Sequence, residues 1–165
     1  MSMIPQGEDG SMHDSKSPLS NLVAELLAEF DVEIEDCMDE TVVKFNHENI
    51  VPIAKIIKFD SRLDCDYLRC LSAVDYKDRI EIVYHLSSLE KRHKLILKTY
   101  LTPEYPTISS VVSVWPGSNW FEREAHDLFG VTFLGHPNLE PLLLFEGFEG
   151  YPGRKNFPFN DYDEW

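Results

Sequence analysis

Cysteine is scarce in this sequence, and its three copies are not spaced like metal ligands. The 165 residues include Cys37, Cys65 and Cys70. An odd set without a disulfide framework favours a reducing compartment. An iron–sulfur cluster needs four close ligands that are typically thiolates, and the C-x4-C pair of Cys65 and Cys70 falls short of that. The alternation of the surrounding segment places Cys70 on one strand face with Leu68, which predicts thiols in the core.

Other motifs that hold metals or nucleotides are lacking as well. The six histidines show no H-x3-H or H-E-x-x-H spacing, so a zinc site is not expected. Neither the dinucleotide pattern G-x-G-x-x-G nor the P-loop pattern G-x-x-x-x-G-K-[ST] occurs. We therefore expect this chain to hold no cofactor of its own.

Basic residues and long apolar runs are also few. The chain has 15 Lys and Arg against 29 Asp and Glu, a net charge of −14. This balance argues against nucleic-acid binding and against docking on anionic lipid, because both need clustered basic side chains. No apolar run approaches the ~18 residues of a membrane helix, and residues 1–18 lack the apolar segment of a signal peptide. Any attachment to a membrane is expected to come through partner proteins.

The acidic residues gather at the two ends of the chain. Residues 1–50 hold 12 acidic and 2 basic side chains, residues 119–165 hold 9 and 3, and the stretch between them holds 8 and 10. Such a distribution suits a protein that faces basic partner surfaces, and an acidic surface kept for solubility explains it equally well. The hydrophobic fraction of 43% is enough for the core of one domain.

Hydrophobic periodicity predicts an α+β fold with two layers. Residues 1–18 have no such period and are predicted to form a disordered tail, with order beginning at the N-cap and proline pair Ser17-Pro18. The elements predicted after it are a helix over 18–30, short strands over 32–34 and 43–45, a helix over 47–58, and strands over 67–75, 80–87 and 94–101. The order α-β-β-α-β-β-β over residues 19–115 implies an antiparallel-rich sheet with helices on one face.

The composition of the sequence changes after residue 102. Seven of the ten prolines lie at or beyond Pro103. In residues 116–165 one helix is predicted, over about 119–129, and no period follows it. An irregular arm that is nonetheless rich in Leu and Phe is predicted to extend over a neighbouring protein instead of standing in solvent.

The predicted helix of this segment has the sharpest local pattern in the chain. Asn119 with Glu122 resembles a capping box, and Gly130 supplies a left-handed stop. At 100° per residue, one apolar face is formed by Phe121, Ala125, Leu128 and Phe129.

A stripe of Trp120, Glu124 and Asp127 flanks this apolar face, with Arg123 beside Asp127. A catalytic carboxylate pair would need a nucleophile or a substrate pocket, and neither is evident. A metal site is excluded by geometry, because the candidate ligands point around most of the helix: Glu122, Glu124, His126 and Asp127. Two alternatives stay open, namely a capped helix with i,i+4 ion pairs and a carboxylate stripe that accepts a basic side chain from a partner.

A long, ordered set of residues extends from Trp115 to Lys155. It comprises Trp115-Pro116, Asn119-Trp120, Glu122-Arg123-Glu124, Asp127-Leu128-Phe129-Gly130, Phe133, Gly135-His136-Pro137, Gly150, Pro152 and Arg154-Lys155. Together these resemble the signature of the C subunit of NADH-quinone oxidoreductase, respiratory complex I. That signature reads approximately as ERE, two residues, D, two apolar residues and G, followed by GHP and a late R-K. With the weaker agreement upstream, the resemblance covers about residues 19–160.

The resemblance implies a non-catalytic, structural subunit in the peripheral arm of a proton-translocating enzyme that transfers electrons from NADH to quinone. It implies tight binding to the D subunit, which forms the quinone site, and to neighbouring iron–sulfur subunits, with flavin and iron–sulfur clusters held by those partners. Such a subunit is peripheral, at the cytoplasmic face of the cell membrane. The residues expected at the partner interface are Trp120, Glu122, Arg123, Glu124, Asp127, His136, Arg154 and Lys155.

Two segments depart from the family pattern. Glu140-Pro141 stands where the family usually has two basic residues, and residues 150–155 replace a pattern like GHPLRK. The equivalent subunit of a related membrane-bound hydrogenase, or of a ferredoxin- or coenzyme F420-fed oxidoreductase, is therefore an alternative. A free-standing acidic binding protein or hydrolase would require a ligand pocket or a nucleophile–base pair that the sequence does not show. Arg154 and Lys155 either clamp an acidic partner or anchor the arm.

Overall fold

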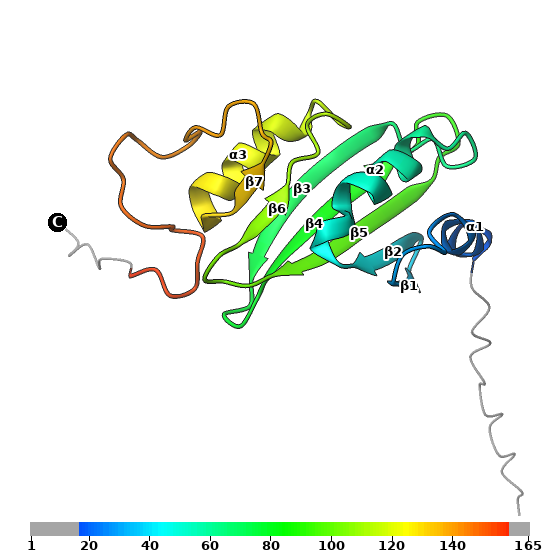
Figure 1. Cartoon of the computed structure of the whole chain (residues 1–165), viewed down its shortest axis with the longest axis horizontal. Helices are drawn as coiled ribbons and strands as arrows, with labels where there is room; N and C mark the ends of the chain where they lie inside the picture. Colours follow the sequence, from blue (N-terminus) through cyan, green and yellow to red (C-terminus); the bar gives the residue numbers. More distant parts are fainter. Residues whose placement is uncertain (1–16, 159–165) are drawn as a thin grey trace, which may run out of the picture.

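The computed structural model describes residues 17–158 and shows a five-stranded sheet with helices packed against it and an irregular C-terminal segment (Figure 1). The helices are α1 (Pro18–Leu26), α2 (Ile50–Phe59) and α3 (Ser118–Phe129), with a 3-10 turn over His47–Asn49. The strands are β1 (Val32–Cys37), β2 (Glu40–Phe45), β3 (Tyr67–Asp75), β4 (Ile80–Ser87), β5 (Lys94–Leu101), β6 (Thr107–Ser109) and β7 (Thr132–Leu134). Residues 1–16 of the predicted tail and 159–165 of the predicted arm lie outside the described residues.

The main sheet has the strand order β1-β2-β5-β4-β3. Three of its four neighbouring pairs are antiparallel, and β2 with β5 is the parallel pair. The predicted α+β fold with an antiparallel-rich sheet is confirmed, and β3, β4 and β5 have the predicted bounds. The chain passes from β2 through α2, β3 and β4 before β5 returns to pair with β2. Strand β3 is thereby left at one edge of the sheet, where α3 lies beside it (Figure 1).

One face of the sheet is buried beneath α1 and α2. The alternation in β5 shows this face directly, because Leu95, Leu97 and Leu101 are buried while the residues between them are more exposed, apart from the buried Thr99. Helix α2 carries apolar residues at helical spacing on the side that faces the sheet, and it buries Ile50, Ile53, Ala54 and Ile57. Fully burying an isoleucine side chain contributes about 1.5–3 kcal/mol, so the three buried isoleucines of α2 stabilise the domain by several kcal/mol.

The first helix and the first hairpin differ from their predicted bounds. Helix α1 ends at Leu26, and residues 27–29 continue as turns, so that Phe30 packs against the core from outside the helix. Strands β1 and β2 are longer than predicted and meet at a tight turn in which Met38 has φ of +55°. The predicted hairpin around residues 38–40 is confirmed.

The start of α1 is fastened to this hairpin. Ser17 is the N-cap, its hydroxyl accepts from the Ser20 amide, and Pro18 follows as the first helical residue. The Asp36 carboxylate accepts from the Ser17 amide at 2.7 Å, from Thr41 Oγ1 at 2.9 Å and from the Ser20 hydroxyl. Burial alone would raise the pKa of Asp36, but these hydrogen bonds prevail and lower it to about 2.

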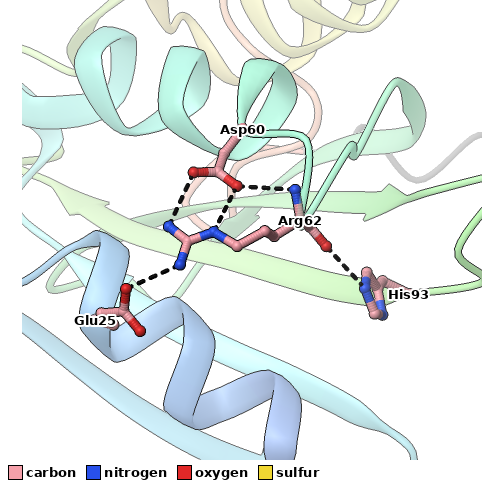
Figure 2. Close-up of polar contacts among 4 residues, drawn as sticks. All are labelled: Glu25, Asp60, Arg62 and His93. Carbon is pink, nitrogen blue, oxygen red and sulfur yellow. Dashed lines mark hydrogen bonds and ion pairs between the residues drawn. The ribbon is translucent and has the colours of Figure 1, made fainter.

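Arg62, in the loop after α2, contacts α1, the C-cap residue of α2 and the loop before β5 (Figure 2). Its guanidinium pairs with Asp60 at 3.2 Å and with Glu25 of α1 at 2.9 Å, and its carbonyl contacts His93 Nε2 at 3.3 Å. These groups are partly exposed, so the ion pairs contribute only modestly to stability while they link α1 to the loop after α2.

Strands β6 and β7 were not expected from the sequence. They pair in parallel with Ile108 opposite Phe133, and α3 lies between them in the chain. Each has three residues, too few for an alternating pattern to be read between prolines and polar residues. Val131 and Phe133 belong to the same buried cluster as the main sheet. The core therefore continues beyond residue 115, where the predicted α/β domain ends.

The predicted placement of Cys70 was wrong because β3 contains a β-bulge. Leu68 pairs with Leu86, but the register shifts before Cys70, which pairs with His85. Beyond the bulge the buried positions are Leu71 and Ala73, while Cys70 is half-buried on the other face. Cys65 is fully buried as expected, and burial raises the pKa of its thiol to about 12.

Candidate partner interface

Helix α3 begins differently from the predicted capping box. Its N-cap is Gly117, which makes no side-chain capping bond. Glu122 instead points into the protein, where one carboxylate oxygen accepts from the Val111 amide at 2.8 Å and from the Ser118 hydroxyl at 3.1 Å. The residue has 0% exposure. Its side chain therefore fastens α3 to the preceding loop, and in this conformation it is not available to a partner.

Burial raises the pKa of the Glu122 carboxyl, and the hydrogen bonds from its neighbours oppose that shift. Burial raises the pKa of the Tyr84 phenol on β4, and the nearby charge of Glu122 raises it further. Glu122 is thus a structural carboxyl within the core, not a member of an exposed catalytic pair.

The segment after β7 turns back onto α3, and Asp127 holds it there. One oxygen of the Asp127 carboxylate accepts from three consecutive amides, Leu142 at 3.2 Å, Leu143 at 2.8 Å and Leu144 at 2.8 Å. Burial would raise the pKa of Asp127, but the three amides lower it overall. Hydrogen bonds to a charged acceptor are the strong class, so this contact fixes the middle of the arm.

Arg123 holds the residues just before that point. Its Nε donates to the Glu140 carbonyl and its Nη2 to the Pro141 carbonyl, each at 3.0 Å. Its guanidinium also lies 5.3 Å from the centre of the Trp120 ring. The i,i+4 ion pair between Arg123 and Asp127 that the helix suggested is absent from residues 17–158. The two residues bind successive peptide groups of the same arm instead.

A second fastening lies at the C-terminal end of α3. Arg154 donates to the Phe129 carbonyl at 2.7 Å and to the Pro103 carbonyl at 2.8 Å. The first is a terminal helix carbonyl, where a cation is favourable. Asp75 at the end of β3 accepts from the Lys155 amide at 2.8 Å. Of the two roles considered for this basic pair, anchoring the arm is the one that these contacts support for Arg154.

Two glycines allow this close packing. Gly130 ends α3 with φ of +71°, as predicted, and a Cβ there would lie 2.6 Å from the Tyr151 ring. A Cβ on Gly153 would come within 2.9 Å of the Leu128 carbonyl, to which the Gly153 amide donates. A side chain at either position would push the arm away from the helix.

His136 is half-buried at the start of the arm. Its Nδ1 accepts from the Asn138 amide at 3.1 Å, which shapes the turn after β7. Burial lowers the pKa of the imidazole, a hydrogen bond with the Asn119 backbone opposes this shift, and the nearby charge of Arg123 adds to it. Nearby, His126 donates from Nδ1 to the Val131 carbonyl at 2.8 Å. Both histidine side chains thus form hydrogen bonds with nearby backbone groups.

The fastened arm and α3 display several large apolar side chains to solvent. Trp120 is 59% exposed and Phe145 71% exposed. Leu143 and Tyr151 of the arm are exposed as well, and so is Leu134 at the end of β7. Phe145 itself rests edge-on against Phe148 at 5.4 Å between ring centres, so it is held in position rather than hanging free. Exposed aromatic residues on an ordered surface are typical of protein–protein contact sites.

Within residues 17–158, no group of three or more His, Cys, Asp or Glu side chains is arranged to hold a metal ion. Across the same stretch, no helix combines the length and apolar character needed to cross a membrane. The surface built by α3 and the arm is the feature of the described chain that most resembles a functional site.

Residues 43–163 match the model of the family described as respiratory-chain NADH dehydrogenase, 30 Kd subunit. The chain belongs to this family. It is 41% identical over 114 residues to the C subunit of NADH-quinone oxidoreductase of Roseiflexus castenholzii, covering 67% of this chain and 66% of that protein. The corresponding protein of Hyphomonas neptunium is 38% identical over 128 residues, covering 76% and 63%.

The mitochondrial 30.4 kDa subunit of NADH-ubiquinone oxidoreductase of Neurospora crassa is 32% identical over 162 residues, covering 96% of this chain and 56% of that protein. The chain thus spans less than two thirds of the length of these curated relatives. The sequence-based assignment to this family of complex I subunits is confirmed.

Solved structures share the fold. A trypsin-resistant fragment (1-134) of Nqo5 superposes with a TM-score of 0.62 at 27% identity, covering 73% of this chain and 98% of the fragment. A protein in the structure of the membrane-bound sulfane sulfur reductase, an archaeal respiratory membrane complex, gives a TM-score of 0.74 at 23% identity, covering 90% and 96%. The second likeness shows the fold alone.

The residues selected from the sequence fall into two groups. Internal contacts are made by Glu122, Asp127, His136 and Arg154, and by the backbone-binding side of Arg123. Trp120, Glu124 and Lys155 remain exposed, and their contact with a partner stays a prediction. Sequence reasoning missed Asp75, whose signal was an acidic residue at the last position of a strand, just before a turn.

Proposed function

We propose that this chain is a non-catalytic subunit of a proton-translocating NADH-quinone oxidoreductase, in which α3 and the arm dock against the quinone-site subunit. Membership of the 30 kDa subunit family supports the assignment to that class of complex. The observation that carries the docking surface is the arm itself, which charged contacts hold in place while Trp120 and Phe145 stay exposed. An ordered apolar surface of this kind needs a partner to cover it.

The proposal also says which subunits hold the redox cofactors. Flavin and iron–sulfur clusters reside in neighbouring subunits, whereas this chain supplies surface and holds none. It is peripheral, at the cytoplasmic face of the cell membrane, and reaches the membrane through those neighbours. Elemental analysis of the purified chain tests the first point, because stoichiometric iron or zinc would contradict it.

The related assemblies considered above differ in how electrons enter. The curated relatives are called NADH-quinone or NADH-ubiquinone oxidoreductase subunits, which favours an NADH-fed complex over a hydrogenase or a ferredoxin-fed one. A free-standing acidic hydrolase has no support, because Glu122 is a buried structural carboxyl and Asp127 binds backbone amides.

Purification of the tagged chain from membranes in mild detergent tests this function. We expect NADH- and flavin-binding subunits and the quinone-site subunit to be recovered with it in fixed proportion. Recovery of the chain alone from intact membranes would contradict the proposal. Recovery with hydrogenase subunits in place of the NADH-binding ones would replace it by the alternative complex.

A further inference from the structure

A groove separates α3 from the edge strand β3. Its volume is about 170 Å³, and its walls are formed by Cys70, Leu71, Ser72, Ala73, Phe121, Glu124, Ala125, Leu128 and Phe129. For comparison, an apolar cavity of about 150 Å³ admits benzene. The groove therefore has room for one side chain of a partner, but not for a strand or a helix.

The bulge in β3 helps to form this groove. It shifts the register before Cys70, so that Cys70 pairs with His85 and Ser72 with Val83, on the face that α1 and α2 leave uncovered. Leu71 and Ala73, on the other face of the strand, line the groove as well. Three of the four lining residues of the strand have small side chains, and the helix contributes Phe121 and Leu128.

Glu124 is the one charged residue that lines the groove. The other two carboxylates of its helix are already engaged, Glu122 inside the core and Asp127 with the arm. Within residues 17–158 the exposed carboxylate of Glu124 has no hydrogen-bond or ion-pair partner. The structure thus combines an apolar slot with a single free anion at its wall.

We propose that in the assembled complex this groove receives one Arg or Lys side chain of a neighbouring subunit, with its methylene stem between Phe121 and β3 and its cationic head on Glu124. The inference rests on the proposed function, since it needs a docked partner. Arg and Lys suit such a site because their stems are apolar and their heads are not. A purely apolar occupant would cover Glu124 and leave a carboxylate without a partner, which is costly.

Charge removal tests the contact between Glu124 and the cation. Glu124→Gln keeps the shape of the side chain and removes its charge. The control is Glu29→Gln, which removes a charge from an exposed residue beyond α1, at the other edge of the sheet. We expect Glu124→Gln to release the chain from purified complex on the order of tenfold faster or more, because the partner's cation loses its counter-charge. Glu29→Gln should release at the wild-type rate.

The three cysteines report occupancy of the groove in one experiment. An alkylating reagent is applied to the free chain and to the assembled complex, and each thiol is quantified by peptide mass spectrometry. Cys70 lines the groove, Cys37 is exposed on β1 at the opposite edge, and Cys65 is buried. We expect Cys70 to be protected in the complex relative to the free chain. Modification of Cys65 would reveal unfolding, and Cys37 reports the activity of the reagent.

Each outcome decides the proposal separately from the function. If the complex assembles and Cys70 still reacts as fast as in the free chain, the groove is empty in the complex. That result would contradict the proposed occupancy and leave the proposed function intact. If Cys70 is protected but Glu124→Gln is released at the wild-type rate, the occupant of the groove is an apolar residue and the proposed cation is contradicted. Failure of the chain to join any respiratory complex would remove the proposed function itself.

Discussion

Asp127 on α3 and Leu143 in the arm are joined by a 2.8 Å hydrogen bond from a backbone amide to a carboxylate, and the amides on either side of Leu143 donate to the same oxygen. A carboxylate that gathers three consecutive amides makes an irregular segment follow one path. The family signature residues of the helix therefore bind their own chain, and the path of the arm that they fix determines the proposed docking surface.

Asp127→Asn should loosen the arm without unfolding the sheet. The amide oxygen of Asn can still accept, but it carries no charge, and hydrogen bonds to charged groups contribute about 1.5–3 kcal/mol. We expect faster hydrogen exchange at residues 142–144 and unchanged exchange in β4 and β5. Asp39→Asn, in the exposed turn between β1 and β2, is the matched control. Equal exchange in all three proteins would show that Asp127 does not hold the arm.

Glu122→Gln should make stability less dependent on pH. Burial raises the pKa of Glu122 above its ordinary value of 4.5, so the folded protein binds a proton more tightly than the unfolded chain. Its contribution is full below pH 4.5 and is lost as the pH rises through the folded-state pKa. We expect the urea midpoint of the wild type to fall, relative to that of Glu122→Gln, across this range. Parallel curves for the two proteins would refute a raised pKa.

Asp36 should produce the opposite dependence at acid pH. Hydrogen bonds lower its pKa from 3.8 to about 2 in the folded protein, so the unfolded chain binds the proton more tightly. The contribution of Asp36 is present above pH 3.8 and is lost as the pH falls toward 2. Melting curves should therefore show a steeper acid loss of stability for the wild type than for Asp36→Asn. Glu35→Gln, on the neighbouring residue of β1, serves as the control.

Two truncations separate the tail from the helix cap. Deleting residues 1–16 should leave the melting temperature almost unchanged, as expected for a segment with few apolar residues. Deleting residues 1–18 also removes Ser17, which caps α1 and donates to Asp36, so a loss of about 1–2 kcal/mol is expected. Such a loss lowers the melting temperature by several degrees. A large loss from the shorter deletion would mean that the tail itself stabilises the domain.

The sequence predicted those elements whose pattern is local and repeated. Strands β3, β4 and β5 had enough alternating residues for their bounds to be assigned correctly, and the Gly130 stop was read from one residue with a single conformational role. The bulge at Cys70 was invisible, because it is set by how β3 pairs with β4 and not by the residues of β3 alone. Because the alternation was assumed to continue through the bulge, Cys70 was assigned to the wrong face of β3.

The candidate site was predictable in its members and not in their roles. Helical spacing placed Glu122, Asp127 and Arg123 correctly on the helix. Apart from Ser118, which binds Glu122, the groups they bind lie 11 to 18 residues away in segments without periodicity. An i,i+4 ion pair was the local option, and the backbone of the arm competed successfully for both charges. Glu124 was left free, since these contacts of the arm go to Arg123 and Asp127.

The central claim is that α3 and the arm form the docking surface, and an alanine comparison tests it most directly. Phe145 in the arm is 71% exposed and Leu89 in the β4–β5 turn is 67% exposed, so both truncations remove similarly exposed apolar side chains. The yield of partner subunits that co-purify with each tagged variant is the measurement. We predict a marked loss for Phe145→Ala and the wild-type yield for Leu89→Ala. Full recovery of partners by Phe145→Ala would contradict the claim.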